Sequence, residues 1–479
     1  MPTLEAPAEH RPLKDVSTYE LQMRYVLVKS MQLGMVNALT PEIRRLSRHA
    51  PTRPGERNPQ TVAVDGTISM LQSLAKFAME QTAVKVFFGG IGEEANKQTA
   101  IKLIDKYIGT IIDNAAPEDS AGQYIEERIA RAMKGYDKAL DVCSALHKHY
   151  EDDPSRQGYI SAAFKLSTVA EATDLEIISD CLNDPENKDK PWGQKKIRGE
   201  NIDPATLRPN ETVAYWEFEK IYERVKPFFE RAHAMGIEVY ADAEETRINP
   251  AILELCGRLN RDGIRPTVTV QAYLRNADET VDELMKLDPP PNIKLVRGAY
   301  MHDLIDQHHI WPTKEDTDAC YNRLLTRLYN SDKIDVLTVA THNQKSRHIA
   351  EDMVRESSGK NHTRVVFATL MGMGNDLIAP PRELAIEERK YQPSILDENK
   401  IAVLGAIAYF GRRGKEFMSV TDPAVGKTRA ELELEQIEAE IKRRGVGADG
   451  IKKLTDTAAR MTHNFFSKRW KGYSEAARA

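Results

Sequence analysis

The chain has 479 residues, a formal net charge of −5 and a sequence pI near 6.2, and this acidic balance argues against a nucleic-acid partner because such proteins carry dense basic patches. No apolar run reaches the roughly 18 residues that a membrane-spanning helix needs. The 4 cysteines are scattered without metal-ligand spacing, so we expect neither a metal site nor a disulfide framework.

Residues 1–84 are predicted to form an N-terminal helical region. Apolar residues recur at helical spacing in Tyr19–Leu39 and again in Ile68–Met79, on either side of a polar stretch rich in proline and arginine. The N-terminal segment contains several acidic residues, whereas a mitochondrial transit peptide is rich in arginine and serine and poor in acidic residues. No transit peptide is recognisable in this sequence, which fits a cytoplasmic protein or a chain truncated or processed at this end.

Short β-branched segments alternate with helical ones from residue 85 to 424. The predicted strands are Tyr107–Asn114, Ser161–Ser167, Ile237–Glu244, Thr267–Tyr273, Ile293–Ala299, Asp335–Asn343, Arg364–Met371 and Glu388–Pro393. Helical periodicity lies between them, as in Val213–Met235, Pro250–Arg261, Glu279–Leu287, Lys314–Tyr329 and Gln344–Glu356. Eight such repeats indicate an α/β fold of the (β/α)8, TIM-like barrel type. No GxGxxG motif follows the first strand, which argues against an open dinucleotide-binding sheet.

Polar side chains recur at the carboxyl ends of the predicted strands, where barrel enzymes place their chemistry. In chain order these ends carry Asp113 and Asn114, Lys165, Asp242 and Glu244, Gln271 and Tyr273, Lys294 and Arg297, His342 and Asn343, and Tyr391. Each has an ordinary structural explanation, since a lysine can extend to solvent, an aspartate can cap a helix and a lone histidine is usually hydrogen-bonded in a core. Their recurrence favours a functional site, because stability alone would not prefer one end of the barrel.

A late helical segment, residues 408–417, carries the adjacent arginines Arg412 and Arg413. Such pairs are usually solvated charge, but two guanidiniums can also bind a small carboxylate through paired, charge-assisted hydrogen bonds. Tyr409 and Glu416 lie one turn before and one turn after them, on nearby faces of the helix. This arrangement suits a small zwitterion with an apolar ring. Residues 425–479 are predicted to form a C-terminal helical tail.

A set of motifs between about residues 85 and 420 resembles, in sequence and in order, the proline dehydrogenase family. The motifs are Ala163-Phe-Lys-Leu-Ser167, Val239-Tyr-Ala-Asp-Ala-Glu-Glu245, Val270-Gln-Ala-Tyr-Leu274, Lys294-Leu-Val-Arg-Gly-Ala-Tyr300, Ala340-Thr-His-Asn343, Leu370-Met-Gly-Met373 and Tyr409-Phe-Gly-Arg-Arg413. The resemblance implies a distorted (β/α)8 barrel that binds FAD, oxidises L-proline to Δ1-pyrroline-5-carboxylate by hydride transfer and passes electrons to a quinone. It also implies a mitochondrial location with peripheral membrane contact, and the intervening segments look most like the fungal branch.

The resemblance assigns substrate-site roles to residues that match the family motifs. Those roles are a cationic clamp on the substrate carboxylate (Arg412, Arg413, Lys165), walls around the pyrrolidine ring (Tyr300, Leu370, Tyr409) and acids that organise the pocket and hold the arginines (Asp242, Glu416).

The resemblance assigns cofactor roles in the same way. Gln271 matches a side chain at the isoalloxazine edge, and Lys294 matches a position near the reactive flavin nitrogen. The positions that bind the FAD pyrophosphate in the family are matched by Val296, Arg297, Gly298 and Ala299. Those at the adenosine end are matched by Thr341 and His342.

Alternatives to L-proline oxidation stay open. Tyr391-Gln-Pro393 matches a context in which the family packs a tyrosine against the proline ring, but the connection to Arg412 is longer than usual, so whether Tyr391 enters the pocket is undecided. If it does not, 4-hydroxy-L-proline or another cyclic imino acid fits as substrate. A family member that binds flavin without turnover is a second alternative. A Schiff-base lyase that uses Lys165 as nucleophile is a third, and it needs an uncharged lysine.

Overall fold

The computed structural model describes residues 17–32, 88–114, 125–198, 202–299, 309–357, 360–374, 377, 386–396, 421–422 and 426–460. Part of the predicted substrate site lies outside these residues, namely Tyr300, Tyr409, Arg412, Arg413 and Glu416. The helix predicted at Ile68–Met79 lies outside them as well. These assignments therefore stay predictions.

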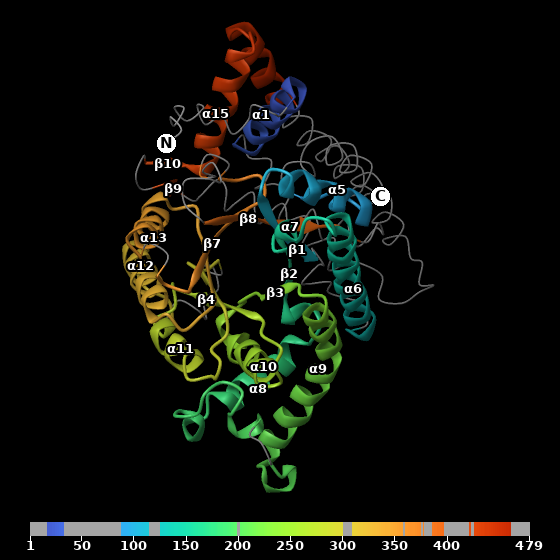
Figure 1. Ribbon diagram of the computed structural model, residues 1–479, viewed down its shortest axis with the longest axis vertical. Coiled ribbons are helices and arrows are strands. Elements are labelled where there is room, and N and C mark those ends of the chain that lie inside the picture. Colours follow the sequence, from blue (N-terminus) through green and yellow to red (C-terminus); the bar gives the residue numbers. More distant parts are fainter. Residues whose placement is uncertain are drawn as a thin grey trace, which may run out of the picture.

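Eight parallel strands form a closed barrel at the centre of Figure 1. They are β1 (Ile108–Asn114), β2 (Ile160–Phe164), β3 (Glu238–Ala241), β4 (Thr267–Gln271), β5 (Ile293–Val296), β6 (Val336–Ala340), β7 (Arg364–Leu370) and β8 (Glu387–Ser394). Each strand pairs with the next one in sequence, and β8 closes the ring against β1, with Tyr391 opposite Ile111. The (β/α)8 fold predicted from the sequence is confirmed.

Several strands end earlier than the sequence predicted, and this places site residues just beyond them. The residues that directly follow β2, β3, β5 and β6 are Lys165, Asp242, Arg297 and Thr341. They therefore lie at the start of the loops at the carboxyl end of the barrel. The eighth strand was predicted at Glu388–Pro393, and in the structure it extends one residue further at each end, to Glu387 and Ser394.

Helices surround the barrel in Figure 1. They include α5 (Glu93–Ile104), α6 (Ile125–His149), α7 (Pro154–Gln157), α8 (Ala172–Leu182), α9 (Pro209–Ala234), α10 (Asn249–Arg261), α11 (Ala277–Leu284), α12 (Lys314–Ser331) and α13 (Gln344–Ser357). The helices predicted between the strands are present with shifted ends. α5 precedes β1 and contacts β8 through Gln392 Nε2, which donates to the Asn96 backbone carbonyl at 3.2 Å.

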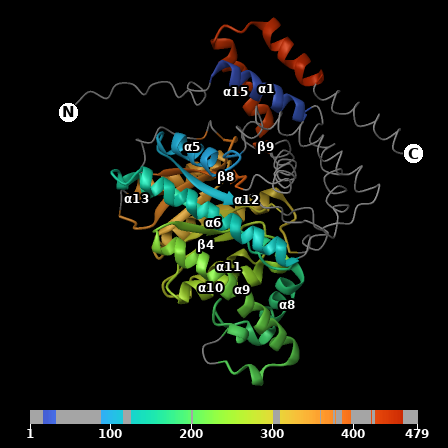
Figure 2. The same ribbon diagram turned by 90° about the vertical axis from the view of Figure 1, so that its right-hand side faces the viewer.

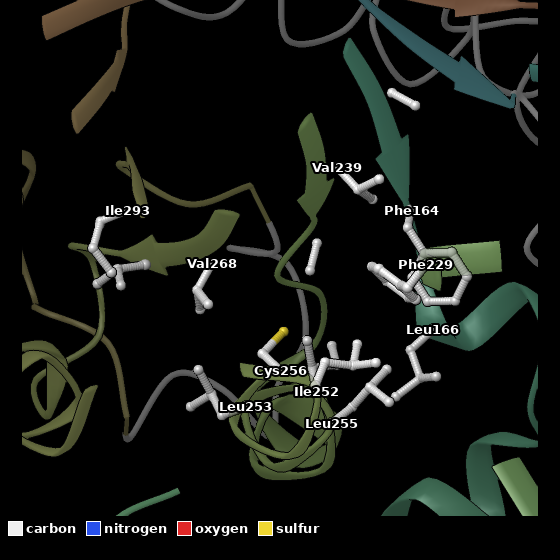
Figure 3. Packing of buried hydrophobic residues seen from close by; sticks show 14 of the residues in the cluster. Phe164, Leu166, Phe229, Val239, Ile252, Leu253, Leu255, Cys256, Val268 and Ile293 are labelled. Atoms are coloured by element: carbon white, nitrogen blue, oxygen red, sulfur yellow. The ribbon is translucent and has the colours of Figure 1, made fainter. Parts of the chain in front are cut away.

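The main hydrophobic core lies between the outer faces of the strands and these helices. In Figure 3, Val239, Val268 and Ile293 from three neighbouring strands lie near α10, whose Ile252 and Cys256 belong to the same buried cluster. Full burial of each such aliphatic side chain contributes about 1.5–3 kcal/mol. This packing fixes the strands whose ends carry the polar residues.

The interior of the barrel is polar at its amino end. Arg389 on β8 is buried there and donates hydrogen bonds to Glu387 Oε1 at 2.5 Å, Glu238 Oε2 at 2.6 Å and the Tyr240 hydroxyl at 2.8 Å. A Cβ on Gly109 would lie 2.8 Å from Arg389 Cγ, so the glycine on β1 makes room for this side chain. Two carboxylates compensate the buried cation, and the network fills the amino end of the barrel.

Helices from opposite ends of the described chain pack together beyond the barrel (Figures 1 and 2). They are α1 (Thr18–Gln32), α15 (Arg429–Arg443) and helical residues 448–460; α15 is preceded by the short pair β9 (Thr421–Asp422) and β10 (Lys427–Thr428). The Tyr25 hydroxyl lies 3.0 Å from Thr455 Oγ1, and Ser30 Oγ donates to the Ala458 carbonyl at 3.4 Å. The described helices of the predicted N-terminal region and C-terminal tail are thus in contact, and the described part of the tail also contains the short strand β10. Within the described ranges, no helix is long and apolar enough to cross a membrane.

Candidate active site

Asp242, Lys165, Lys294 and Tyr391 meet in the carboxyl half of the barrel. Asp242 Oδ1 accepts a hydrogen bond from Lys294 Nζ at 2.6 Å, and Asp242 Oδ2 accepts one from the Tyr391 hydroxyl at 2.6 Å. Lys165 Nζ lies 3.5 Å from Asp242 Oδ2 and donates to the Tyr391 hydroxyl at 2.8 Å. All four were predicted as site residues, and the fold brings them together from four different strands or strand ends.

Asp113 is a fifth member of this cluster, and the sequence prediction did not include it among the site residues. Its side chain is fully buried, and Oδ1 accepts a hydrogen bond from Lys165 Nζ at 2.5 Å. Asp113 Oδ2 has no hydrogen-bond partner among the described residues. The signal was present in the sequence, because Asp113 lies at the polar end of the first strand. Negative and positive groups alternate from Asp113 through Lys165 and Asp242 to Lys294, so the cluster is close to neutral.

Asp242 is ionised in this cluster. Burial alone would raise its pKa, but Lys294, Lys165 and the hydrogen bond from Tyr391 outweigh burial and hold the pKa of Asp242 at about 2. At neutral pH the carboxylate is therefore a hydrogen-bond acceptor and carries no proton. It fixes two ammonium groups and one phenol in a single arrangement.

Aromatic and aliphatic side chains line the interior beside the charged cluster. Lys294 Nζ lies 5.0 Å from the ring centroid of Tyr391 and 5.7 Å from that of Tyr240. Leu370 is the last residue of β7, stands in register with Tyr391 and packs against the same small interior core. Tyr391 is 5% exposed and its hydroxyl is hydrogen-bonded on both sides, so its ring has a fixed position inside the barrel.

Gln271 at the end of β4 presents a buried acceptor. Its Nε2 donates to the Glu244 backbone carbonyl at 3.1 Å, whereas its Oε1 is buried without a hydrogen-bond partner in the described part of the chain. Glu244 itself accepts at Oε1 from the Ser167 backbone N–H at 3.0 Å. An unpaired buried amide oxygen costs about 1–3 kcal/mol, so a ligand that donates an N–H to Gln271 would be stabilised here.

Arg297 lies directly after β5 and is held by side chains from other elements. Its Nε donates to Asp318 Oδ1 at 2.6 Å, Nη1 to Thr341 Oγ1 at 2.6 Å and Nη2 to Ser346 Oγ at 2.8 Å. Its guanidinium carbon lies 4.2 Å from the ring centroid of Tyr321. The fold therefore joins Arg297 and Thr341, both predicted on the cofactor side.

The backbone turns sharply after Arg297. The carbonyls of Val296 and Arg297 accept hydrogen bonds from the N–H groups of Ala272 and Tyr273, at 2.8 and 2.7 Å. Gly298 then adopts a φ of +123°, and a Cβ there would lie 2.3 Å from the Tyr273 ring, so only glycine fits. Ala299 follows in an exposed bend.

His342 connects the ends of β6 and β7. Its Nε2 accepts a hydrogen bond from the Leu370 backbone N–H at 3.3 Å. A Cβ on Gly374, whose φ is +65°, would lie 2.8 Å from His342 Cδ2. This close packing fixes the imidazole beside the predicted pocket wall.

These residues fit a flavin dinucleotide. The buried Gln271 Oε1 suits an N–H on the edge of a ring system, and the fixed cation of Arg297 suits a pyrophosphate. Lys294 and Asp242 lie deeper in the same half of the barrel. Within the described residues, no group of three or more His, Cys, Asp or Glu side chains could hold a metal ion.

Curated proteins similar to this chain align with it over part of their length. Proline dehydrogenase 2 (mitochondrial) of Arabidopsis thaliana is 32% identical over 199 residues, which cover 37% of this chain and 42% of the relative. Hydroxyproline dehydrogenase of Bos taurus is 28% identical over 272 residues, which cover 52% of this chain and 56% of the relative. The chain thus spans about half the length of these relatives.

Comparison with solved structures supports the fold. Proline utilization A from Bdellovibrio bacteriovorus, inactivated by N-propargylglycine, aligns with 88% of this chain and 44% of its own at a TM-score of 0.57 and 17% sequence identity. Family membership rests on the sequence instead, because the family model for proline dehydrogenase matches residues 71–419, well over half of the chain. The chain therefore belongs to the proline dehydrogenase family.

Proposed function

We propose that this protein is a flavoenzyme that oxidises L-proline to Δ1-pyrroline-5-carboxylate. The observation that carries the proposal is the buried cluster of Asp242, Lys165, Lys294 and Tyr391 in the carboxyl half of a closed barrel, in a chain of the proline dehydrogenase family. Several of its curated relatives are named as dehydrogenases of proline or hydroxyproline.

The substrate carboxylate would be held by Arg412 and Arg413, with Tyr300, Tyr409 and Glu416 completing the site. The contacts of Lys165 differ from those expected of a residue that binds the substrate carboxylate, because its ammonium group is engaged by other side chains of the protein. Its ammonium donates to Asp113 and Tyr391 and lies 3.5 Å from Asp242, so its three N–H bonds have protein acceptors nearby. We infer that Lys165 mainly fixes Tyr391 and contributes positive charge, while the arginines bind the carboxylate.

The amine of the substrate has to lose its proton before a hydride can leave the ring carbon. The cations around the carboxylate favour the neutral amine, because nearby positive charge disfavours an ammonium. Asp242 does not keep the released proton, since its pKa is about 2 and both of its oxygens are engaged. Asp242 therefore acts by orienting its neighbours and not as the base.

The cofactor would be held by Gln271, Lys294, Val296, Arg297, Gly298, Ala299, Thr341 and His342. FAD, when bound, supplies the two-electron acceptor for this oxidation. A quinone is the proposed final electron acceptor, reached through peripheral contact with a membrane. The mitochondrion is the proposed compartment, since several relatives carry that location in their names.

The alternatives are less well supported. Tyr391 lies inside the barrel with its ring fixed, which favours L-proline over a bulkier hydroxylated ring. Two carboxylates beside Lys165 stabilise its ammonium form, which cannot attack a carbonyl, so they disfavour a Schiff-base lyase. A flavin-binding member without turnover is separated from the enzyme by the experiment below.

The test is an anaerobic absorbance titration of the purified protein with L-proline and, separately, with trans-4-hydroxy-L-proline. We expect a flavin spectrum that L-proline bleaches, and slow inactivation by N-propargylglycine. Bleaching mainly by hydroxyproline would keep the enzyme class and change the substrate. Bound flavin that neither compound bleaches would favour the non-catalytic alternative. A protein that fails to bind added FAD would overturn the proposal.

A further inference from the structure

The guanidinium of Arg297 is held in one orientation by three parts of the fold. Asp318 on α12 accepts from Nε, Thr341 after β6 accepts from Nη1, and Ser346 on α13 accepts from Nη2. An arginine side chain has several rotatable bonds, and its entropy opposes any single placement. Three acceptors from three elements remove that freedom before a ligand arrives.

Asp318 and Ser346 are themselves fixed. Lys314, one turn earlier on α12, donates to Asp318 Oδ2 at 2.5 Å, which leaves Oδ1 for Arg297. Burial would raise the pKa of Asp318, but Lys314 and Arg297 outweigh it and lower the pKa, so the carboxylate is charged. Ser346 Oγ donates to Asn322 Oδ1 at 2.7 Å and so directs its lone pairs to Arg297.

The aromatic ring of Tyr321 lies against the guanidinium of Arg297. The ring centroid of Tyr321 is 4.2 Å from the guanidinium carbon, and the Tyr321 hydroxyl donates to the Leu295 carbonyl of β5 at 3.2 Å. Tyr321 is fully buried, so this ring cannot shift without disturbing the core. A guanidinium stacked on a ring and bonded at its edge has its plane defined.

The guanidinium keeps capacity for a ligand. It has five N–H donors, and the three bonds to described residues use one on each nitrogen. With the described residues alone as partners, one N–H remains on each of Nη1 and Nη2. Two such donors can bind phosphate oxygens in the bidentate manner typical of arginine.

We propose that Asp318, assisted by Ser346, is a positioning residue that presents Arg297 to the pyrophosphate of the flavin dinucleotide. The inference rests on the proposed function and adds to it, because it assigns a cofactor-affinity role to α12 and α13 residues that do not belong to the predicted site. Asp318 acts through Arg297 and need not touch the cofactor.

The test compares binding of FAD and of riboflavin, which lacks the pyrophosphate, to the full-length chain by quenching of flavin fluorescence. Asp318→Ala removes the acceptor for Nε, so we expect its Kd for FAD to rise about tenfold or more while its Kd for riboflavin stays unchanged. Asp318→Asn keeps an oxygen acceptor and should recover most of the FAD affinity. Ser346→Ala should weaken FAD binding in the same direction. Glu315→Gln, an exposed change in the first turn of α12, is the matched control and should bind both flavins normally.

The outcomes separate the possible failures. Equal losses of FAD and riboflavin affinity in Asp318→Ala, with a lower melting temperature, would indicate a merely structural role and overturn the inference. Tighter FAD binding in both Asp318 variants would also overturn it, because Asp318 would then only neutralise Arg297. A wild-type chain that binds neither flavin would instead contradict the proposed function.

Discussion

Asp242 carries a charge that both the site and the fold depend on. Lys294 and Lys165 share its carboxylate inside the barrel, and removing one partner of a buried ion pair costs about 3–5 kcal/mol. We therefore expect Asp242→Asn to lower the melting temperature at neutral pH and to lower kcat/KM for proline. Thermal unfolding followed by circular dichroism measures the first effect.

The same residue gives the stability a pH dependence with a defined sign. The folded pKa of Asp242 is about 2, against an ordinary value of 3.8. Its stabilisation is thus fully present above about pH 5 and is lost as the pH falls towards 2. The gap in melting temperature between wild type and Asp242→Asn should narrow as the pH is lowered. Asp180→Asn, an exposed change on α8, is the control, and a gap that widens in acid would contradict the assignment.

Tyr391 combines a polar and a steric role that two substitutions can separate. Tyr391→Phe removes hydrogen bonds to charged groups, worth about 1.5–3 kcal/mol, and should lower kcat/KM for L-proline by about ten- to a hundredfold. Its preference for L-proline over trans-4-hydroxy-L-proline should persist because the ring remains. Tyr391→Ala should reduce that preference. Steady-state kinetics with both substrates measure this preference. An unchanged preference in Tyr391→Ala would show that the Tyr391 ring does not line the substrate pocket.

At the scale of elements, β8 is the least expected strand because its buried side chains are mostly polar. Lys390 Nζ donates to the Met373 carbonyl at 2.6 Å, and Gln392 Oε1 accepts from the Thr110 hydroxyl at 3.0 Å. A buried parallel strand usually reads as a continuous apolar run. The sequence predicted this strand, but it could not predict the partners, because contacts between remote residues leave no local periodicity.

The outer face of β8 also carries Glu388, which pairs with Arg347 of α13. Burial raises the pKa of Glu388 even though Arg347 opposes the rise. Arg347→Met removes that opposition, so the pKa of Glu388 should rise further and the folded variant should favour its protonated form. A raised folded pKa gives stability that is lost as the pH increases, so the variant should be destabilised more at about pH 8 than at about pH 6.

Melting temperatures at these two pH values test the prediction for β8. Replacing both partners, as in Arg347→Met with Glu388→Leu, should recover much of the loss because no charge is left unpaired. Arg355→Met, in an exposed pair on the same helix, is the control and should change little. A loss in Arg347→Met that does not vary with pH would show that packing, and not the charge of Glu388, is responsible.

For the whole molecule, the sequence predicted the barrel because each strand and each helix has its own local pattern. The eightfold repetition of that strand–helix unit along the chain indicates the closed fold. The sequence also predicted that polar strand ends would converge, and Lys165, Asp242, Lys294 and Tyr391 do so. Asp113 was among these polar strand ends but was not chosen as a site residue, and the sequence did not indicate that it bonds Lys165 or that Arg389 fills the amino end. Both depend on which side chains face each other across a closed barrel, and that follows from register rather than from composition.

The packing of α1 against the C-terminal helices is a second feature that local pattern could not reveal, since Tyr25 and Thr455 are 430 positions apart. Leu21 on α1 and Ile437 and Ile441 on α15 are fully buried. Ile441→Asp would place an unpaired charge among them, at a cost of several kcal/mol. α1 forms side-chain hydrogen bonds with Thr455, with Ala458 and with Arg444, which directly follows α15, so we expect these helices to open together while the barrel stays folded.

Hydrogen exchange measured by mass spectrometry tests this separation directly. In Ile441→Asp, amides of α1, α15 and residues 448–460 should lose protection, because exchange reports the free energy of local opening. Amides of β1 to β8 should exchange as in the wild type. Glu438→Gln removes only an i,i+4 surface pair with Lys442 and should leave both regions unchanged. Equal loss of protection in the strands would mean that the helices from the two ends of the described chain and the barrel unfold as one cooperative unit.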